Sequence, residues 1–282
     1  MPGPSPSVSD VIVAGSGFAG LAAATALAEA GARVCLLEAR GHPGGRARSW
    51  TDPETGAVVD NGQHLFMGCY GETLRLLDRI GCRDRLALQP RLELPLVERG
   101  GRVGRLRFPR LPLPLARPAG LLTFPGLSWP ERWGLLRVGR EVRRVSGRDH
   151  PAGLEERTVS GWLSSLRQGE EARRRLWHPI AIAALNEDPA RASAAMLVPV
   201  LREAFHGGAD GARLGVARVG LSELYADPAL LYLRERGAEV RLRAPVRRIL
   251  QQEGRCVGVL LGDGTRLAAP AVVAAVPPAD LL

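Results

Sequence analysis

The apolar positions of the first forty residues indicate one strand–helix–strand unit. A short apolar run at 11–14 stands directly before glycines and predicts a buried parallel strand. The Ala- and Leu-rich segment 21–30 predicts a helix that ends at Gly31. A second apolar run at 34–37 is followed by Glu38. Strand, glycine turn, helix and strand in this order are typical of a βαβ unit.

The middle of the chain predicts a second, helix-rich domain. Residues 73–80 carry a helical pattern, whereas recurring prolines over 92–129 are expected to break any long regular element. We interpret this proline-rich stretch as the crossing between two domains. Helical periodicity then recurs in four segments: 131–145, 154–177, 190–205 and 222–236.

The last fifty residues predict β-structure. Two β-rich runs, 239–250 and 256–261, are bounded by acid–glycine turns at 253–254 and 263–264. Such turns between alternating runs indicate an antiparallel meander. The apolar run 271–276 suits a strand that rejoins the first sheet.

Composition fits a globular protein of one large domain or two ordinary ones, with 282 residues and 45% hydrophobic side chains. The net charge is +9, and all 38 basic residues are arginine. We interpret the arginine excess chiefly as a coding bias, with affinity for a membrane surface as the alternative. The arginines are scattered without interleaved aromatic residues, so we expect no nucleic-acid binding.

Four cysteines form no CxxC pair and have no histidine at metal-ligand spacing, so we predict free thiols in a reducing cytoplasm and no metal site. We expect no signal peptide, because no charged region precedes an apolar run at the start. No apolar run reaches 18 residues, so we expect no transmembrane helix. A cytoplasmic location is predicted, with peripheral contact at the inner membrane surface as a variant.

A glycine-rich motif between the first strand and the first helix predicts a dinucleotide site. The motif is Gly15-Ser16-Gly17-Phe18-Ala19-Gly20. Its first glycine allows a tight turn, its second a close approach of pyrophosphate, and its third the packing of helix on strand. Glu38, at the end of the second strand, can accept hydrogen bonds from a ribose. Its neighbours Ala39 and Arg40 are included among the expected cofactor contacts.

A second loop, Gly44-Gly45-Arg46, favours FAD over NAD. Adjacent glycines can turn backbone amides toward a second anionic group, and Arg46 can pair with phosphate oxygens. The alternative is an ordinary surface loop.

The polar segment Asp60-Asn61-Gly62-Gln63-His64 suits a loop beside a flavin ring. We include Gly62, Gln63 and His64 among the cofactor contacts. His64 is the one weak candidate for an acid–base group. The alternative is that it only bonds the chain or the cofactor.

These motifs, GxGxxGLxxAxxLxxxGxxVxxxE followed by GGRxxS, resemble those of the amine-oxidase-type FAD oxidoreductases, which include the phytoene desaturases. Three further segments resemble the hydroxysqualene dehydroxylase branch. They are Val59-Asp60-Asn61-Gly62-Gln63-His64 with Gly68-Cys69-Tyr70, Trp177-His178-Pro179 with Ala183-Ala184-Leu185-Asn186, and Arg191-Ala192-Ser193-Ala194.

The resemblance implies an α/β fold with FAD as cofactor. A Rossmann-like doubly wound FAD domain with a β-meander would comprise residues 8–92 and 215–282. A helix-rich α+β substrate domain, 93–214, would be inserted in it. Val246 would lie in the strand that meets the adenine. The family's C-terminal Gly-Asp segment is expected to be missing after Leu282, which puts retention of FAD in question.

The implied activity is reductive removal of the hydroxyl group of hydroxysqualene to give squalene, a step toward hopanoids. A lipophilic isoprenoid substrate needs an apolar tunnel, for which residues 111–133 and 177–200 are candidates, and residues 111–129 could also rest on a membrane. The catalytic acid is open among His64, His178 and His206. The electron donor and oligomeric state are not predicted.

Three other functions stay open at this point. A phytoene-type or other carotenoid desaturase would use the flavin in the opposite redox direction. A flavin amine oxidase fits less well, because 3 tyrosines and 5 phenylalanines offer little for an aromatic cage. A truncated, non-catalytic protein that binds FAD or a membrane is the third.

Overall fold

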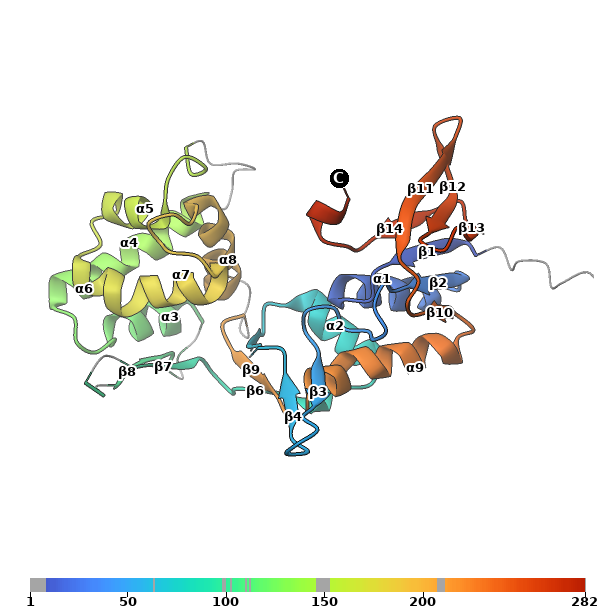
Figure 1. Ribbon diagram of the computed structural model, residues 1–282. Helices are drawn as coiled ribbons and strands as arrows, with labels where there is room; N and C mark the ends of the chain where they lie inside the picture. Colours follow the sequence, from blue (N-terminus) through green and yellow to red (C-terminus); the bar gives the residue numbers. More distant parts are fainter. Residues whose placement is uncertain are drawn as a thin grey trace, which may run out of the picture. The chain divides into compact units, whose positions relative to one another are not determined.

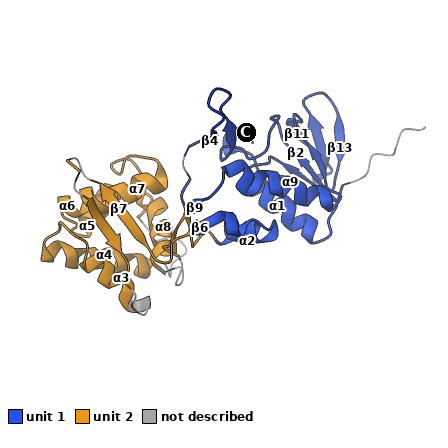
Figure 2. Cartoon of the chain, turned by 90° about the horizontal axis from the view of Figure 1, so that it is seen from below, with its two compact units in different colours: residues 1–65, 71–87, 216–282 blue, residues 66–70, 88–215 orange. Residues whose placement is uncertain are grey.

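The computed structural model of the chain (Figure 1) describes residues 9–62, 64–97, 100–101, 103–109, 111, 113–145, 153–206 and 211–281. It separates into two compact units (Figure 2). Unit 1 comprises residues 1–65, 71–87 and 216–282, and unit 2 comprises residues 66–70 and 88–215. The sequence predicts borders at 92/93 and 214/215, with residues 66–70 in the first domain.

Unit 1 is built on a four-stranded sheet in the order β10-β2-β1-β14, with all neighbours parallel. The strands are β1 (Val11–Ala14), β2 (Val34–Leu37), β10 (Glu239–Arg241) and β14 (Val272–Ala274). Ile12 lies opposite Cys35 on one side and Val272 on the other. The predicted βαβ unit and the return of the late apolar run to the first sheet are both confirmed.

The two faces of this sheet are covered differently (Figure 1). Helices α1 (Phe18–Glu29) and α9 (Asp227–Glu235) pack against each other and against the sheet. An antiparallel meander of β11 (Val246–Gln252), β12 (Arg255–Leu261) and β13 (Arg266–Ala268) shares a core with Ile12, Cys35 and Leu37. Successive side chains of a strand point to opposite faces of the sheet, and both faces are covered, as is typical of a parallel sheet.

The predicted helix 222–236 consists of two parts. A π-helical turn, Ser222–Ala226, precedes α9, and Pro228 stands in the first turn of that helix. Because proline has no amide hydrogen, it cannot complete the normal i to i−4 bond, and the turn before it widens. The same arrangement recurs in unit 2, where the π-helical turn Arg173–Trp177 precedes Pro179.

Unit 1 also contains several smaller elements. Strands β3 (Ser49–Thr51) and β4 (Val58–Asp60) form an antiparallel hairpin. Helix α2 (Gly71–Arg79) agrees with the expected helical pattern over 73–80. Short 3-10 turns occupy Arg83–Arg85 and Pro278–Asp280.

Unit 2 is helix-rich, with one hairpin of β7 (Glu93–Val97) and β8 (Val103–Arg107). Its α-helices are α3 (Leu113–Leu122), α4 (Trp129–Val145), α5 (Val159–Ser165), α6 (Glu170–Ala172), α7 (His178–Leu185) and α8 (Ala194–His206). Its core contains the fully buried side chains of Leu135, Val138, Trp162, Trp177 and Leu197.

The described part of the stretch 92–129 holds a hairpin of two five-residue strands and the ten-residue helix α3, which contains Pro118. The helical pattern over 154–177 does not form a single helix. It is interrupted after α5, because Arg167 adopts a left-handed backbone with φ of 54°. A right-handed helix cannot continue through that conformation.

Strands β6 (Leu86–Leu88) and β9 (Leu214–Ala217) straddle the borders of the two units in sequence. They belong to a three-stranded sheet in the order β5-β9-β6, with β5 at Phe66–Met67. Across the described ranges, no helix combines the length and the apolar character needed to cross a bilayer.

Because α1 packs closely on the turn before it, a methyl group added at Gly20 is predicted to destabilise the fold. A Cβ added at Gly20 would lie 1.8 Å from the carbonyl oxygen of Gly15, whereas one added at Gly17 would meet nothing within 4 Å. We expect Gly20→Ala to lower the free energy of unfolding by about 1–3 kcal/mol or more, as in other overpacked cores. Chemical denaturation followed by circular dichroism measures this. Gly17→Ala is the control, and an equal loss in both variants would contradict the packing argument.

Candidate functional site

The glycine turn between β1 and α1 has the conformation that its sequence predicts. Gly15 has a φ of +102°, and a Cβ there would lie 2.5 Å from the carbonyl oxygen of Ala275. Gly17 is the N-cap residue of α1, which has no side-chain cap and no acidic side chain in its first turn. The first amides of a helix lack intrahelical acceptors and carry partial positive charge. The turn therefore leaves the amino end of α1 available for an anion.

Glu38 lies directly against this turn. Its Oε2 accepts hydrogen bonds from the Ser16 amide at 2.9 Å and the Ser16 hydroxyl at 2.5 Å, and its Oε1 accepts one from the Arg40 amide at 2.9 Å. Only 8% of the residue is exposed. A carboxylate offers about four acceptor positions, so three donors leave it about one more. Glu38, which follows β2, therefore contacts the glycine turn that follows β1. We call Ser16, Glu38 and Arg40 the polar corner.

The second glycine loop rests on the first. The Gly44 amide donates to the carbonyl oxygen of Ser16 at 2.9 Å, and a Cβ added at Gly45 would lie 3.2 Å from the Cα of Gly17. Both loop glycines have positive φ, at +98° and +59°. Arg46 is exposed, and within the described ranges its guanidinium has no hydrogen bond or ion pair. The two loops and this free cation are therefore close in space.

Tyr225, which the sequence did not single out, ties the two loops together. Its hydroxyl donates to the carbonyl oxygen of Gly44 at 2.6 Å, and its ring stacks on that of Phe18 with centroids 3.7 Å apart and planes at 8°. The side chain is fully buried in the π-helical turn before α9, and burial raises the pKa of its hydroxyl well above the usual range. The phenol therefore stays protonated and keeps donating. An isolated tyrosine in an apolar segment gives no signal in the sequence from which this contact could be found.

The predicted residues after Glu38 lie beside the start of β11. The Arg243 amide donates to the carbonyl oxygen of Arg40 at 2.9 Å, and the Ala244 amide donates to that of Glu38 at 2.8 Å. The side chains of Ala39 and Arg40 are exposed. Val246 follows two residues later as the first residue of β11. Parts of the chain separated by two hundred residues thus meet at the carboxyl end of β2.

Asp60 belongs to an internal hydrogen-bond cluster. Its Oδ1 accepts bonds from the Ser49 hydroxyl at 2.6 Å and the Leu221 amide at 3.0 Å. Ser49 and Ser222 also exchange hydrogen bonds between side chain and backbone in both directions. Asp60 therefore anchors the β3–β4 hairpin to the segment before α9. Asn61, similarly, donates from its side-chain amide to the carbonyl oxygen of Arg46 at 2.8 Å.

Gly62 and His64 are the other described residues of this polar segment. Gly62 has a φ of +90°, and Gln63 lies outside the described residues. His64 is exposed, with Nδ1 3.0 Å from the carbonyl oxygen of Gly62. That contact fits a proton on Nδ1, which leaves Nε2 as the nitrogen that can exchange a proton.

The other two histidine candidates are in unit 2. His178 begins α7, and its Nε2 lies 3.4 Å from the hydroxyl of Ser160. Burial, together with the charge of Arg173, lowers the pKa of His178, so this ring is neutral at pH 7. His206 ends α8, but its side chain is outside the described part of the structure. Both histidines belong to unit 2, whereas the glycine turn belongs to unit 1.

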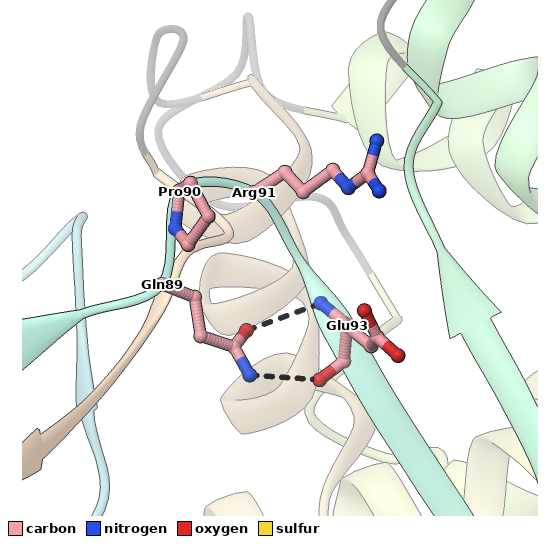
Figure 3. Close-up of a pocket in the computed structure, with 4 residues that line it drawn as sticks. All are labelled: Gln89, Pro90, Arg91 and Glu93. Carbon is pink, nitrogen blue, oxygen red and sulfur yellow. Dashed lines mark hydrogen bonds between the residues drawn. The ribbon is translucent and has the colours of Figure 1, made fainter.

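The residues predicted to line an apolar tunnel divide between the core of unit 2 and its surface. Trp177, Leu197 and Val198 are buried in that core, whereas Ile182 and Met196 are exposed. A cavity of about 210 Å³ in unit 2 is lined by Gln89, Pro90, Arg91 and Glu93 instead (Figure 3).

This cavity lies at a turn that is held by two hydrogen bonds between Gln89 and Glu93. The side-chain amide of Gln89 donates to the carbonyl oxygen of Glu93 at 3.0 Å and accepts from its amide at 3.1 Å (Figure 3). Its volume is below the roughly 300 Å³ at which ligand pockets usually begin. It is therefore a poor candidate for holding a long apolar substrate.

Comparison with known proteins gives one family match over nearly the whole chain. Residues 18–282 match the family described as flavin containing amine oxidoreductase. A hydroxysqualene dehydroxylase of Rhodopseudomonas palustris is 32% identical over 274 residues, and another of Sinorhizobium fredii is 30% identical over 283. Each alignment covers 95% of this chain and 62% of the relative, so the chain spans about three-fifths of their length. A probable zeta-carotene desaturase of Synechococcus elongatus is 29% identical, with 90% of this chain and 55% of the relative covered.

Solved structures agree with this match. A putrescine oxidase variant with redesigned cofactor binding has a TM-score of 0.69 at 26% identity, covering 96% of this chain and 58% of the other. Cyclohexylamine oxidase from Brevibacterium oxydans has a TM-score of 0.66 at 26% identity, with the same coverage of 96% and 58%. The predicted α/β fold class is thereby confirmed.

The buried bond from Tyr225 predicts a measurable loss when the hydroxyl is removed. We expect Tyr225→Phe to lower the free energy of unfolding by about 1–3 kcal/mol, because the carbonyl of Gly44 loses its donor in a buried setting. Tyr232→Phe is the matched control, since its hydroxyl makes only a 3.5 Å contact with Glu29. Urea denaturation of both variants tests this. Equal stability of the wild type and Tyr225→Phe would show that the loops are held without this bond.

Proposed function

The chain belongs to the flavin containing amine oxidoreductase family, and from this premise we propose that it binds FAD in unit 1. One observation carries the proposal: the uncapped amino end of α1 and the buried carboxylate of Glu38 meet at the same glycine turn. An adenine dinucleotide needs both features, one for its pyrophosphate and one for its ribose.

The residues present fit such a cofactor. Gly17 has open space where a side chain would be, and Gly45 approaches it closely, so backbone amides can face a phosphate without obstruction. Arg46 supplies a guanidinium that is not engaged elsewhere in the described chain. Glu38 has about one acceptor position left for a ribose hydroxyl. Val246, beside the Ala244 contact to Glu38, would face the adenine.

For the reaction, we propose reductive dehydroxylation of hydroxysqualene to squalene by the complete protein. The support is the 32% and 30% identity to hydroxysqualene dehydroxylases over 95% of this chain. The C–O bond breaks, the hydroxyl leaves as water after gaining a proton, and a C–H bond forms in its place. Bound FAD, in its reduced form, would supply the hydride, while the protein orients the substrate and excludes water.

The chain's own contribution to the proton step centres on His64. It stays the candidate because it is the histidine of unit 1 that belongs to the predicted cofactor loop. With Nδ1 donating to the carbonyl of Gly62, a ring that carries a proton on both nitrogens would give the Nε2 proton to the leaving hydroxyl and return to the neutral form.

A carotenoid desaturase is the second candidate. The 29% identity to a probable zeta-carotene desaturase favours it nearly as much. The two reactions use FAD in opposite redox states, so they can be separated experimentally. The amine oxidases among the solved structures, at 26% identity, support the fold and the cofactor more than an amine substrate.

The cofactor proposal predicts a loss of flavin when the ribose acceptor is altered. We expect the purified chain, reconstituted with FAD, to show flavin absorbance and Glu38→Gln to bind FAD at least about tenfold more weakly, because a charged acceptor is replaced by a neutral one. Glu235→Gln, an exposed change at the end of α9, is the control. Equal affinity of Glu38→Gln and wild type, or a chain that stays colourless, would contradict FAD binding at this corner.

The reaction is tested with purified protein that has been reconstituted with FAD. Reduced protein is incubated anaerobically with hydroxysqualene, and oxidised protein with zeta-carotene, and products are separated by gas or liquid chromatography. We expect squalene from the first incubation and no desaturated product from the second. The opposite result would assign the protein to the desaturases.

A further inference from the structure

One face of α4 carries an unusual combination of exposed side chains. We call it the α4 stripe, and its members are Trp129, Trp133, Arg137, Arg140 and Arg144. At 3.6 residues per turn these positions fall within an arc of about 80°. Trp129 is 64% exposed and Trp133 is 58% exposed. Two large aromatic side chains so exposed, one turn apart, have no role in the core of unit 2.

The arginines of the stripe are mostly unneutralised. Arg137 and Arg140 form no hydrogen bond or ion pair with any residue that the structure describes, whereas Arg144 pairs with Glu141 at 2.6 Å. The whole helix has five arginines against two glutamates, Glu131 and Glu141. Glu131 is already engaged, because its carboxylate accepts bonds from the amide and hydroxyl of Ser128. The stripe is therefore apolar at its amino end and positive along the rest.

Helix α3 presents a second exposed face, which is entirely apolar. Leu115 is 58% exposed, and Pro118, Ala119 and Leu122, which share its face of the helix, are half-buried. The single charged residue of this helix is Arg117, which follows Leu115 by two positions and so lies on the other side of the helix from Leu115.

Arg132 connects the two surfaces. Its Nη1 donates to the carbonyl oxygen of Leu122 at 3.3 Å, and its guanidinium lies over the ring of Trp129 at 5.0 Å. The carboxyl end of α3 and the amino end of the stripe are therefore adjacent, and the apolar groups of both helices can be continuous.

We propose that the α4 stripe and the adjoining face of α3 dock unit 2 on an anionic lipid surface. Tryptophan is enriched where a membrane meets water, and apolar side chains next to it can enter the acyl boundary. Each arginine near an anionic surface adds an attraction that falls off within a Debye length. The proposal needs no assumption about the flavin chemistry.

Other occupants fit the same features less well. A second copy docked symmetrically on this face would place the arginines of one stripe against those of the other, because a two-fold interface is self-complementary. An acidic protein surface would satisfy the arginines but would leave the charge-free face of α3 without a matching partner. A lipid surface accommodates both the cations and the apolar side chains.

Flotation of the 282-residue chain with vesicles tests the proposal. Neutral phosphatidylcholine vesicles are compared with vesicles that contain phosphatidylglycerol. We expect binding to the anionic vesicles that weakens as salt is raised from 0.05 to about 0.5 M, and much weaker binding to the neutral ones. Absence of binding to anionic vesicles at low salt would overturn the proposal, and so would binding of the chain to polyglutamate beads but not to vesicles.

Variants then locate the surface. Trp129→Ser with Trp133→Ser, and separately Arg137→Gln with Arg140→Gln, are each expected to lower vesicle affinity about tenfold or more. The matched controls lie in unit 1: Leu231→Ser, which is also 58% exposed, and Arg247→Gln with Arg248→Gln, which removes the same charge from exposed positions. Equal losses in stripe variants and controls would contradict docking through this face. Unchanged flavin absorbance in all variants would separate this result from the cofactor proposal.

Discussion

The hydrogen bonds that the Glu38 carboxylate accepts from Ser16 and Arg40 are the interaction on which the rest of unit 1 depends. They fix the turn after β1 to the end of β2, although the two are separated by a whole helix. The loop at Gly44 then rests on this turn through the carbonyl oxygen of Ser16, and Tyr225 holds that loop from the other side. A buried carboxylate is stable in such a place because hydrogen-bond donors satisfy it.

The parts of the fold that the sequence predicts are those with strong local rules. The βαβ unit follows from apolar runs and a glycine turn, and the meander follows from its acid–glycine turns, of which Glu253 and Gly254 both have positive φ. Unit 2 was predicted less well. Pro118 lies inside α3 although proline disfavours a helix interior, and the break after α5 comes from a left-handed Arg167 that no local rule predicts. In both places packing against a large core outweighs the local preference.

For the candidate site, the sequence identifies backbone requirements better than side-chain partners. Gly15 and Gly20 stand where a Cβ would collide with the chain, and Gly45 has a positive φ; a motif with fixed spacing predicts such positions. The partner of a polar side chain depends instead on which distant segment folds against it. Asp60 bonds the hydroxyl of Ser49 and the amide of Leu221, and no motif predicts the second of these partners. Tyr225 was missed for the same reason, since its acceptor lies far away in the sequence.

The position of β14 in the sheet has a consequence for biosynthesis. β1 pairs on one edge with β2, which follows it closely, but its other edge is filled by Val272–Ala274, and the oxygen of Ala275 closes over Gly15. Unit 2 is a nearly continuous stretch of sequence between β1 and β14. During translation, one edge of β1 therefore stays unpaired until most of unit 2 has been synthesised and can fold. Such late, long-range pairing makes closure of the sheet slow and leaves the waiting edge prone to aggregation. A holdase chaperone that shields the emerging amino-terminal segment would be most useful during that interval.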